Sequence, residues 1–342
     1  MRKFDVKGTN ILIFGDLHFS DVFTGKHKNY LENCIYCLNK LTELVREKKP
    51  SAVVLLGDIV GWSETNIKNR EVLSLLCRHL REWNTYGKVY AVRGNHDIKG
   101  YPEFDFLRDI GLIVTSKDCE GYFDFYGNND NVPEVRFHIV DYKEEHRMLN
   151  KLAKPTTNIV LGHNNYTIAG ETTWYSEHDG IEVSHLQNFN DVDMIISGHI
   201  HNPSPNFVHT IMPSGNICQL LYTGCPTRPI KDKNMYELCW AVEFAYHSET
   251  DSTDVDTISI ELKPSTEIFF EDESFVDDKT TEDLEEELNR QAALKDVIGD
   301  LLKYRMNQGN PLEQIDNVPN ATKEAKELAK QYLQIALNNA RT

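Results

Sequence analysis

The sequence predicts an α/β fold, and three observations indicate it. Short runs rich in β-branched and other apolar residues, at 10–16, 52–58 and 88–95, each end in glycine and a polar residue. The stretches between them, 28–48 and 70–83, carry apolar residues at helical spacing. Strand, helix, strand, helix, strand is the order of parallel βαβ units, in which ligands collect at the carboxyl ends of the strands.

The composition is that of an ordinary soluble chain with an acidic balance. Its 342 residues are 40% hydrophobic, enough for a sizeable core, and the net charge of −17 argues against a generally basic nucleic-acid wrapper. Bound divalent cations could still supply local positive charge to a nuclease. No apolar run approaches a membrane span, and the N-terminus lacks the features of a signal peptide. Seven scattered cysteines favour reduced structural thiols in a cytoplasmic protein.

The rest of the chain predicts further strands and then a change of character. A hairpin is expected over 119–142, followed by two strands that end in polar residues, within 158–165 and 193–202. A strongly acidic stretch at 266–287 is typical of a solvated linker. We therefore expect three parts. They are a main domain over 1–245, a strand and acidic linker over 246–280, and a helix-loop-helix over 281–342.

Five predicted strand ends carry side chains of the kinds that bind metal ions. They are GDLH (15–18), GD (57–58), GNHD (94–97), GH (162–163) and GHIH (198–201). One such pair alone is usually a turn, but five in succession after apolar strands are hard to obtain by chance. Aspartate, histidine and asparagine without thiolate suit Mn²⁺, iron or Zn²⁺. The pattern therefore predicts a metal centre built from several strand ends.

This five-part signature, DxH, GD, GNHD, GH and GHxH, resembles that of the calcineurin-like metallophosphoesterases over roughly residues 9–245. The resemblance implies a four-layered αββα sandwich with a small β-rich capping segment and a C-terminal helical pair. It also implies two divalent metal ions, with Mn²⁺ the expected metal. Carried over position by position, one ion would be held by Asp16, His18, Asp58 and His201, and the other by Asp58, Asn95, His163 and His199.

The chemistry of such a site accounts for these residue types. Two cations about 3.5–4 Å apart clamp a phosphate and activate a water near neutral pH, and the carboxylate of Asp58 is the simplest bridge between them. In the family pattern His96 is not a ligand. We expect it to be a general acid or transition-state donor, oriented by Asp97. The alternative is that His96 is only a turn residue bonded to Asp97.

Several segments narrow the choice of phosphoester. The chain has GDIVGWSE (57–64) instead of the GDxVDRG of protein Ser/Thr phosphatases, which disfavours that class. Residues 217–244 and the loop at 162–186 are similar to SbcD-type DNA repair nucleases, including bacteriophage versions. This resemblance implies a DNA exonuclease or endonuclease in the cytoplasm, or in the host cytoplasm for a bacteriophage protein. It also implies a homodimer through the helices near 28–48 and 70–83, and C-terminal helices that dock on an SbcC-type ATPase.

Two other functions stay open. Gly61 stands where the nuclease subfamily commonly has an acidic residue or histidine near the substrate phosphate. A stand-alone phosphodiesterase acting on a cyclic nucleotide or another small molecule is therefore the first alternative. The second is a scaffold protein without chemistry, which the retention of all seven ligand positions disfavours.

Two further groups of side chains have both a functional and a structural interpretation. The first group could stack on a base or pack on its own domain, and the second could contact DNA phosphates or stay solvated. The first group is Tyr166, Trp174, Tyr175 and His178, and the second is Arg228, Lys231 and Lys233.

Overall fold

The computed structural model of the chain divides into two compact units, residues 1–270 and 271–342. In the second unit only Lys326 is described, so the helices predicted within 281–342 lie outside the described residues. The division of the sequence into three parts stays a prediction. The described residues are 2–20, 27–61, 70–98, 102–127, 131–144, 149, 157–167, 180–204, 207–212, 214–229, 236–250, 252–270 and 326.

A six-stranded sheet of order β15-β14-β2-β3-β4-β5 forms one half of the first unit. Three strands expected from the sequence pair in parallel at its centre, which confirms the predicted βαβ units. They are β2 (Asn10–Phe14), β3 (Ala52–Leu55) and β4 (Lys88–Ala91). The antiparallel strands β14 (Leu238–His247) and β15 (Ser252–Glu261) extend one side, and β5 (Val114–Thr115) ends the other.

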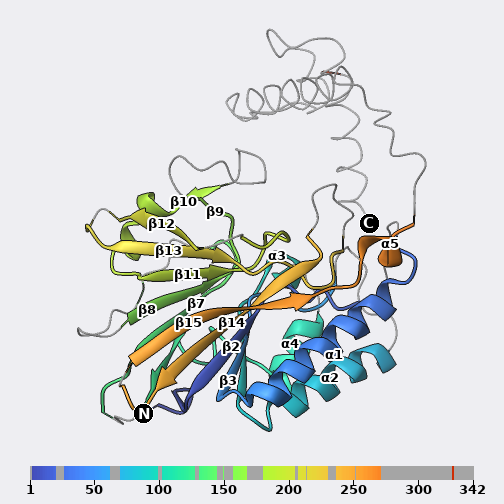
Figure 1. The fold of residues 1–342 in the computed structure, drawn as a ribbon, viewed down its shortest axis with the longest axis horizontal. Helices are drawn as coiled ribbons and strands as arrows, with labels where there is room; N and C mark the ends of the chain where they lie inside the picture. The colour runs from blue at the N-terminus through green and yellow to red at the C-terminus, as the bar shows by residue number, and fades with distance from the viewer. Residues whose placement is uncertain are drawn as a thin grey trace, which may run out of the picture. The chain divides into compact units, whose positions relative to one another are not determined.

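Helices cover one face of this sheet (Figure 1). They are α1 (Tyr30–Lys48), α2 (Arg70–Trp83) and α4 (Pro102–Asp109). Helix α1 begins after Asn29, whose side chain accepts a hydrogen bond from the backbone N–H of Glu32, the usual N-cap interaction. None of the described helices is long and apolar enough to cross a membrane.

The buried strand β2 separates two apolar layers because successive side chains point to opposite faces of a sheet. Leu12 and Phe14 pack in the cluster that contains the helices. Ile11 and Ile13 pack in a second cluster, which joins the two sheets. All of these side chains are at most 1% exposed, as expected for strands buried on both faces.

A seven-stranded sheet packs against the other face of the six-stranded one. Its parallel centre consists of β7 (Val135–Val140), β8 (Thr157–Gly162), β11 (Met194–Ser197) and β13 (Ile217–Tyr222). The flanking strands are β6 (Tyr122–Tyr126), antiparallel to β7, β12 (Val208–Ile211), antiparallel to β13, and β1 (Val6–Lys7), parallel to β6. The antiparallel pair β6–β7 is the hairpin that the sequence predicts.

Short elements cover the outer face of the seven-stranded sheet. They are β9 (Tyr166–Thr167), β10 (Ile181–Glu182) and the 3₁₀ helices η1 (Val183–His185) and η2 (Gln187–Phe189). Their apolar side chains pack on the strands in a third cluster. The described residues of the first unit thus form a layered α/β sandwich of helices, two sheets and a thinner outer layer.

All seven cysteines belong to the described residues, and each is buried and free. Burial raises the pKa of several of their thiols, that of Cys34 and Cys239 to about 12, so these thiols stay protonated near neutral pH. This agrees with the expectation of reduced structural thiols.

Candidate metal centre

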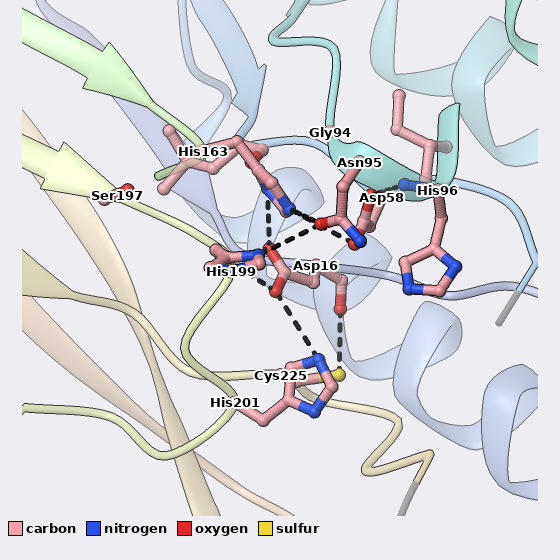
Figure 2. Close-up of polar contacts among 12 residues, drawn as sticks. Asp16, Asp58, Gly94, Asn95, His96, His163, Ser197, His199, His201 and Cys225 are labelled. Carbon is pink, nitrogen blue, oxygen red and sulfur yellow. Dashed lines mark hydrogen bonds and ion pairs between the residues drawn. The ribbon is translucent and has the colours of Figure 1, made fainter. Parts of the chain in front are cut away.

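The predicted ligand residues lie at the carboxyl ends of strands from both sheets. They are Asp16 and His18 after β2, Asp58 after β3, Asn95 after β4, His163 after β8, and His199 and His201 after β11. Because these strand ends converge where the two sheets meet, the seven side chains come together in one place. Figure 2 shows most of them pointing toward a common centre.

One group of donor atoms lies around Asp16. Nε2 of His18 is 3.2 Å from Nε2 of His201 and 3.6 Å from Oδ2 of Asp58. Oδ2 of Asp16 is 3.9 Å from Nε2 of His201. Two nitrogen atoms at this separation fit neighbouring ligands of one cation, because metal–nitrogen bonds of the Zn²⁺ type are about 2.0–2.1 Å long.

A second group lies around Asn95. Its Oδ1 is 3.0 Å from Nε2 of His163 and 3.0 Å from Nδ1 of His199. Nε2 of His163 is also 3.1 Å from Oδ2 of Asp58. The same oxygen of Asp58 therefore borders both groups.

Backbone carbonyl groups fix the two fully buried histidines. Nδ1–H of His18 donates to the carbonyl oxygen of Gly61 at 2.7 Å, and Nδ1–H of His163 donates to that of Leu56 at 2.6 Å. In a neutral ring Nε2 then carries a lone pair. A lone pair of His163 that faces the oxygens of Asp58 and Asn95 is favourable only with a proton or a cation between them. The arrangement therefore fits divalent cations and the outer hydrogen bonds that metal-binding histidines make.

The electrostatics of the centre lead to the same conclusion. Burial lowers the pKa of His18 to about 4 and raises that of Asp16 to about 8. Burial would also raise the pKa of Asp58, but His163 and His18 outweigh it and hold that pKa below its usual range. Conversely, burial would lower the pKa of His163, but Asp58 and Asp16 raise it to about 10. His163 thus retains a proton at a position that a cation could take.

Three of the seven side chains stand on strained backbone. His18, Asp58 and His199 have φ angles of +42°, +45° and +78°, a region that residues other than glycine rarely adopt. Each such conformation costs about 1–3 kcal/mol and is typical of functional sites. The glycines Gly94 and Gly198 permit close approach, since a Cβ would lie 2.1 Å from Oδ1 of Asp58 and 2.2 Å from Oδ1 of Asp16, respectively.

His96 lies beside the first group, in the single-turn helix α3 (Asn95–Ile98). Its backbone N–H donates to Oδ1 of Asp58 at 2.8 Å (Figure 2), and its ring centroid is 5.1 Å from that of His18. Asp97 is buried and accepts hydrogen bonds from the backbone N–H groups of Gly94 and Ile59, at 2.9 and 3.3 Å. Asp97 therefore stabilises the backbone of the turn, and neither of these hydrogen bonds comes from the His96 ring that it was expected to orient.

Comparison with known proteins identifies the family. A family model described as calcineurin-like phosphoesterase matches residues 9–203. The chain belongs to this family. This phosphoesterase is 26% identical over 258 residues to a protein from Staphylococcus saprophyticus named as the SbcD subunit of nuclease SbcCD, and 24% identical over 234 residues to the protein of the same name from Staphylococcus epidermidis. The matches cover 67% and 61% of this chain but only 65% and 61% of the two relatives.

The phosphoesterase is also similar to two solved structures. One is a dimetal phosphatase from Danio rerio, with 12% identity, a TM-score of 0.43, and coverage of 75% of this chain and 99% of that one. The other is a phosphoesterase from E. coli, with 13% identity, a TM-score of 0.34, and coverage of 74% and 100%.

Two side chains near the phosphoesterase centre were not singled out from the sequence. The thiol of Cys225 and ring nitrogens of His18 and His201 lie within 4.8 Å of one another, and Sγ donates to the backbone oxygen of Asp16 at 3.2 Å. Tyr142, after β7, has its ring centroid 5.5 Å from that of His199. The signal for Tyr142 was its place: like the ligands, it closely follows a strand of the parallel set.

Two other side chains are structural rather than exposed to a substrate. Tyr166 is fully buried and packs on Phe189, so it does not present a stacking face. Arg228 is 1% exposed, and its guanidinium donates to Oγ of Ser265 and to the backbone oxygen of Lys263, so it is not a surface cation. The remaining candidates, Trp174, Tyr175, His178, Lys231 and Lys233, lie outside the described residues.

Proposed function

We propose that this phosphoesterase hydrolyses phosphodiester bonds of DNA with two divalent metal ions, Mn²⁺ being the expected metal. Two donor groups that share the carboxylate of Asp58 support a dinuclear site best. When bound, such a pair of ions clamps a phosphate and supplies a hydroxide near neutral pH.

The residues of the chain have separate tasks in this proposal. Asp16, His18 and His201 hold one ion, Asn95, His163 and His199 hold the other, and Asp58 holds both. The backbone oxygens of Gly61 and Leu56 keep the buried rings of His18 and His163 oriented. An amide ligand such as Asn95 adds no negative charge to the site, which leaves more of the cations' charge for the phosphate.

His96 is proposed to donate a proton to the leaving oxygen or to stabilise the charge that develops on it. Its ring is next to that of His18 and its side chain is half-buried, so it borders the first metal group without being enclosed by it. Asp97 would act as a positioning residue, because its hydrogen bonds to Gly94 and Ile59 fix the turn that carries His96.

The choice of DNA is supported by the two staphylococcal relatives, whose name is that of a nuclease component. That likeness also supports DNA and an SbcC-type ATPase as partners. A homodimer, docking through the C-terminal helices and a cytoplasmic location are further parts of the proposal. Gly61 supports the alternative of a small-molecule phosphodiesterase, because it provides a backbone carbonyl but no side chain near the phosphate.

The decisive experiment is Mn²⁺-dependent degradation of end-labelled linear DNA by the wild type and by His96→Asn, with bis(4-nitrophenyl) phosphate as a parallel substrate. The proposal expects DNA degradation that the variant loses while it retains its metal content. Hydrolysis of the small diester with intact DNA would instead support the small-molecule phosphodiesterase. Equal loss of activity and metal in the variant would remove the role proposed for His96.

A further inference from the structure

Tyr142 is the described aromatic residue beside the second metal group. It follows β7, and its ring centroid lies 5.5 Å from that of His199 and 6.3 Å from that of His163. The side chain is half-buried, so part of the ring is accessible to a ligand. On the opposite side of the centre, the ring of His96 lies 5.1 Å from that of His18.

The backbone around Tyr142 is tied to both segments that carry the second group of ligands. Its N–H donates to the carbonyl oxygen of Arg93 at 2.9 Å, two residues before Asn95. The next N–H, that of Lys143, donates to Oδ1 of Asn164 at 2.9 Å, one residue after His163. Asp141 adds a further link by accepting from the N–H of Arg93 at 2.8 Å. The ring is therefore held in register with the ligands rather than carried on an unattached loop.

Tyr142 differs from tyrosines that serve the packing of this fold. The hydroxyl groups of Tyr222 and Tyr30 are buried and donate to backbone oxygens, at 2.7 Å to Tyr166 and 2.9 Å to His18. The hydroxyl of Tyr142 makes no hydrogen bond to any described residue. A half-buried ring with a polar end that no described residue satisfies is suited to contact a ligand at its face.

The adjacent residue adds a positive charge at the same place. Lys143 is exposed, has a φ angle of +63°, and its Nζ lies 5.3 Å from the centroid of the Tyr142 ring. No described carboxylate lies within ion-pair distance of this ammonium group. In a chain of net charge −17, an unneutralised cation beside a phosphate-binding centre favours a polyanionic ligand.

We propose that Tyr142 stacks on the base of the nucleotide whose 5′ phosphate is cleaved, and that Lys143 faces its next phosphate. The nucleoside would then lie on the His163–His199 side and the leaving group on the His96 side of the centre. This inference rests on the proposed phosphodiesterase function and adds that the substrate is a nucleotide polymer recognised through a base. Stacking on an aromatic face is tolerant of sequence, as a nuclease without sequence preference requires.

The test compares two diesters that release the same 4-nitrophenolate, thymidine 5′-(4-nitrophenyl) phosphate and methyl 4-nitrophenyl phosphate. Both are measured with Mn²⁺ on the wild type, Tyr142→Ala, Tyr142→Phe and Tyr86→Ala. Tyr86 is a surface tyrosine just after α2, 36% exposed, and serves as the matched control. A second arm measures binding of a fluorescent phosphorothioate thymidine pentanucleotide by anisotropy, which needs no turnover.

Tyr142→Ala is expected to lower the ratio of kcat/KM for the thymidine ester to that for the methyl ester by about tenfold, chiefly through KM. It is also expected to weaken pentanucleotide binding by a similar factor. Tyr142→Phe and Tyr86→Ala should stay within about twofold of the wild type in both arms, since one keeps the ring and the other is remote.

Either of two results would overturn the inference. An unchanged ratio with unchanged binding would show that the ring touches no base. An equal loss on both esters, with metal content reduced, would show that Tyr142 only supports the histidines. Failure of the wild type to cleave either ester would contradict the proposed phosphodiesterase instead, and the binding arm would still decide the role of Tyr142.

Discussion

The two sides of the metal centre are built alike. Each has one fully buried histidine whose Nδ1–H donates to a backbone carbonyl oxygen, His18 to Gly61 and His163 to Leu56. Each also has one less buried histidine from the segment after β11. Repetition of the same device, from two different sheets, gives both sides a rigid ring with its other nitrogen turned inward.

The surroundings of the two sides differ. Next to His18 lie the imidazole of His96 and the thiol of Cys225, which donates to the protein backbone. Next to His163 and His199 lies the ring of Tyr142, whose hydroxyl makes no hydrogen bond to a described residue. The comparison teaches that metal binding is duplicated while substrate handling is divided, with a proton donor on one side and an aromatic face on the other.

Asp58→Asn should have the largest effect, because Asp58 belongs to both sides. We expect metal affinity to fall by more than about 100-fold, the upper end for loss of a merely supporting residue, with turnover falling at least as far. Metal content after desalting and bis(4-nitrophenyl) phosphate hydrolysis measure this. Asp256→Asn, an exposed carboxylate on β15, is the control. Retention of two tightly bound ions by Asp58→Asn would contradict the shared carboxylate.

His96→Asn should lower turnover by about 10²–10⁴-fold, the usual contribution of a general acid or base. Metal content should not change, because His96 contacts Asp58 through its backbone N–H and asparagine keeps that group. Steady-state kinetics paired with elemental analysis of the same sample check both statements. A variant with wild-type turnover would leave His96 as a turn residue.

His201→Ala and His199→Ala test the two sides separately. Each variant should lose about one of two bound ions, with the affinity of the affected site falling by about 10–100-fold. Titration of metal-free protein with Mn²⁺, followed by electron paramagnetic resonance of the free ion, counts the sites. If either variant lost both ions together, the two sides would not be independent.

Mn²⁺ should raise the melting temperature of the metal-free protein. An ion that binds only the folded state at 100 times its Kd adds about 2.7 kcal/mol, and about 2–4 °C is gained per kcal/mol in a domain of this size class. We therefore expect a rise of about 5–10 °C in differential scanning calorimetry. Asp58→Asn should show little of this rise, and an equal rise in both proteins would place the stabilising ion elsewhere.

Cys225→Ser should have the smallest effect. The thiol donates to the backbone oxygen of Asp16, and a serine hydroxyl can make the same hydrogen bond. Burial holds the pKa of this thiol well above its ordinary value, so it is protonated in the absence of a soft metal. Mn²⁺ affinity and turnover should remain within about twofold of the wild type. A loss of about tenfold or more in Mn²⁺ affinity would mean that the sulfur itself serves as a ligand.

Local features of the sequence were enough to locate the strands and helices of the first unit and the chemical type of the site. Apolar periodicity placed β2, β3 and β4 and helices α1 and α2, because these elements bury a regular face. The identity of the residues after each strand indicated metal ligation, because aspartate, histidine and asparagine at those positions have few other uses in common. The assignment of individual ligands and of His96 stays a prediction, although the structure brings the side chains together.

The tertiary structure decided everything that depends on contacts between distant segments. Pairing of two sheets placed His163 beside Asn95 and Asp58, and the close approach at Gly198 to Asp16 depends on that pairing. The same pairing buried Arg228 and Tyr166, whose roles the sequence alone left open, and brought Tyr142 to the centre, which no sequence motif indicated. A side chain's type and spacing are local properties, but its burial and its neighbours are set by which strands meet, and no local pattern encodes that.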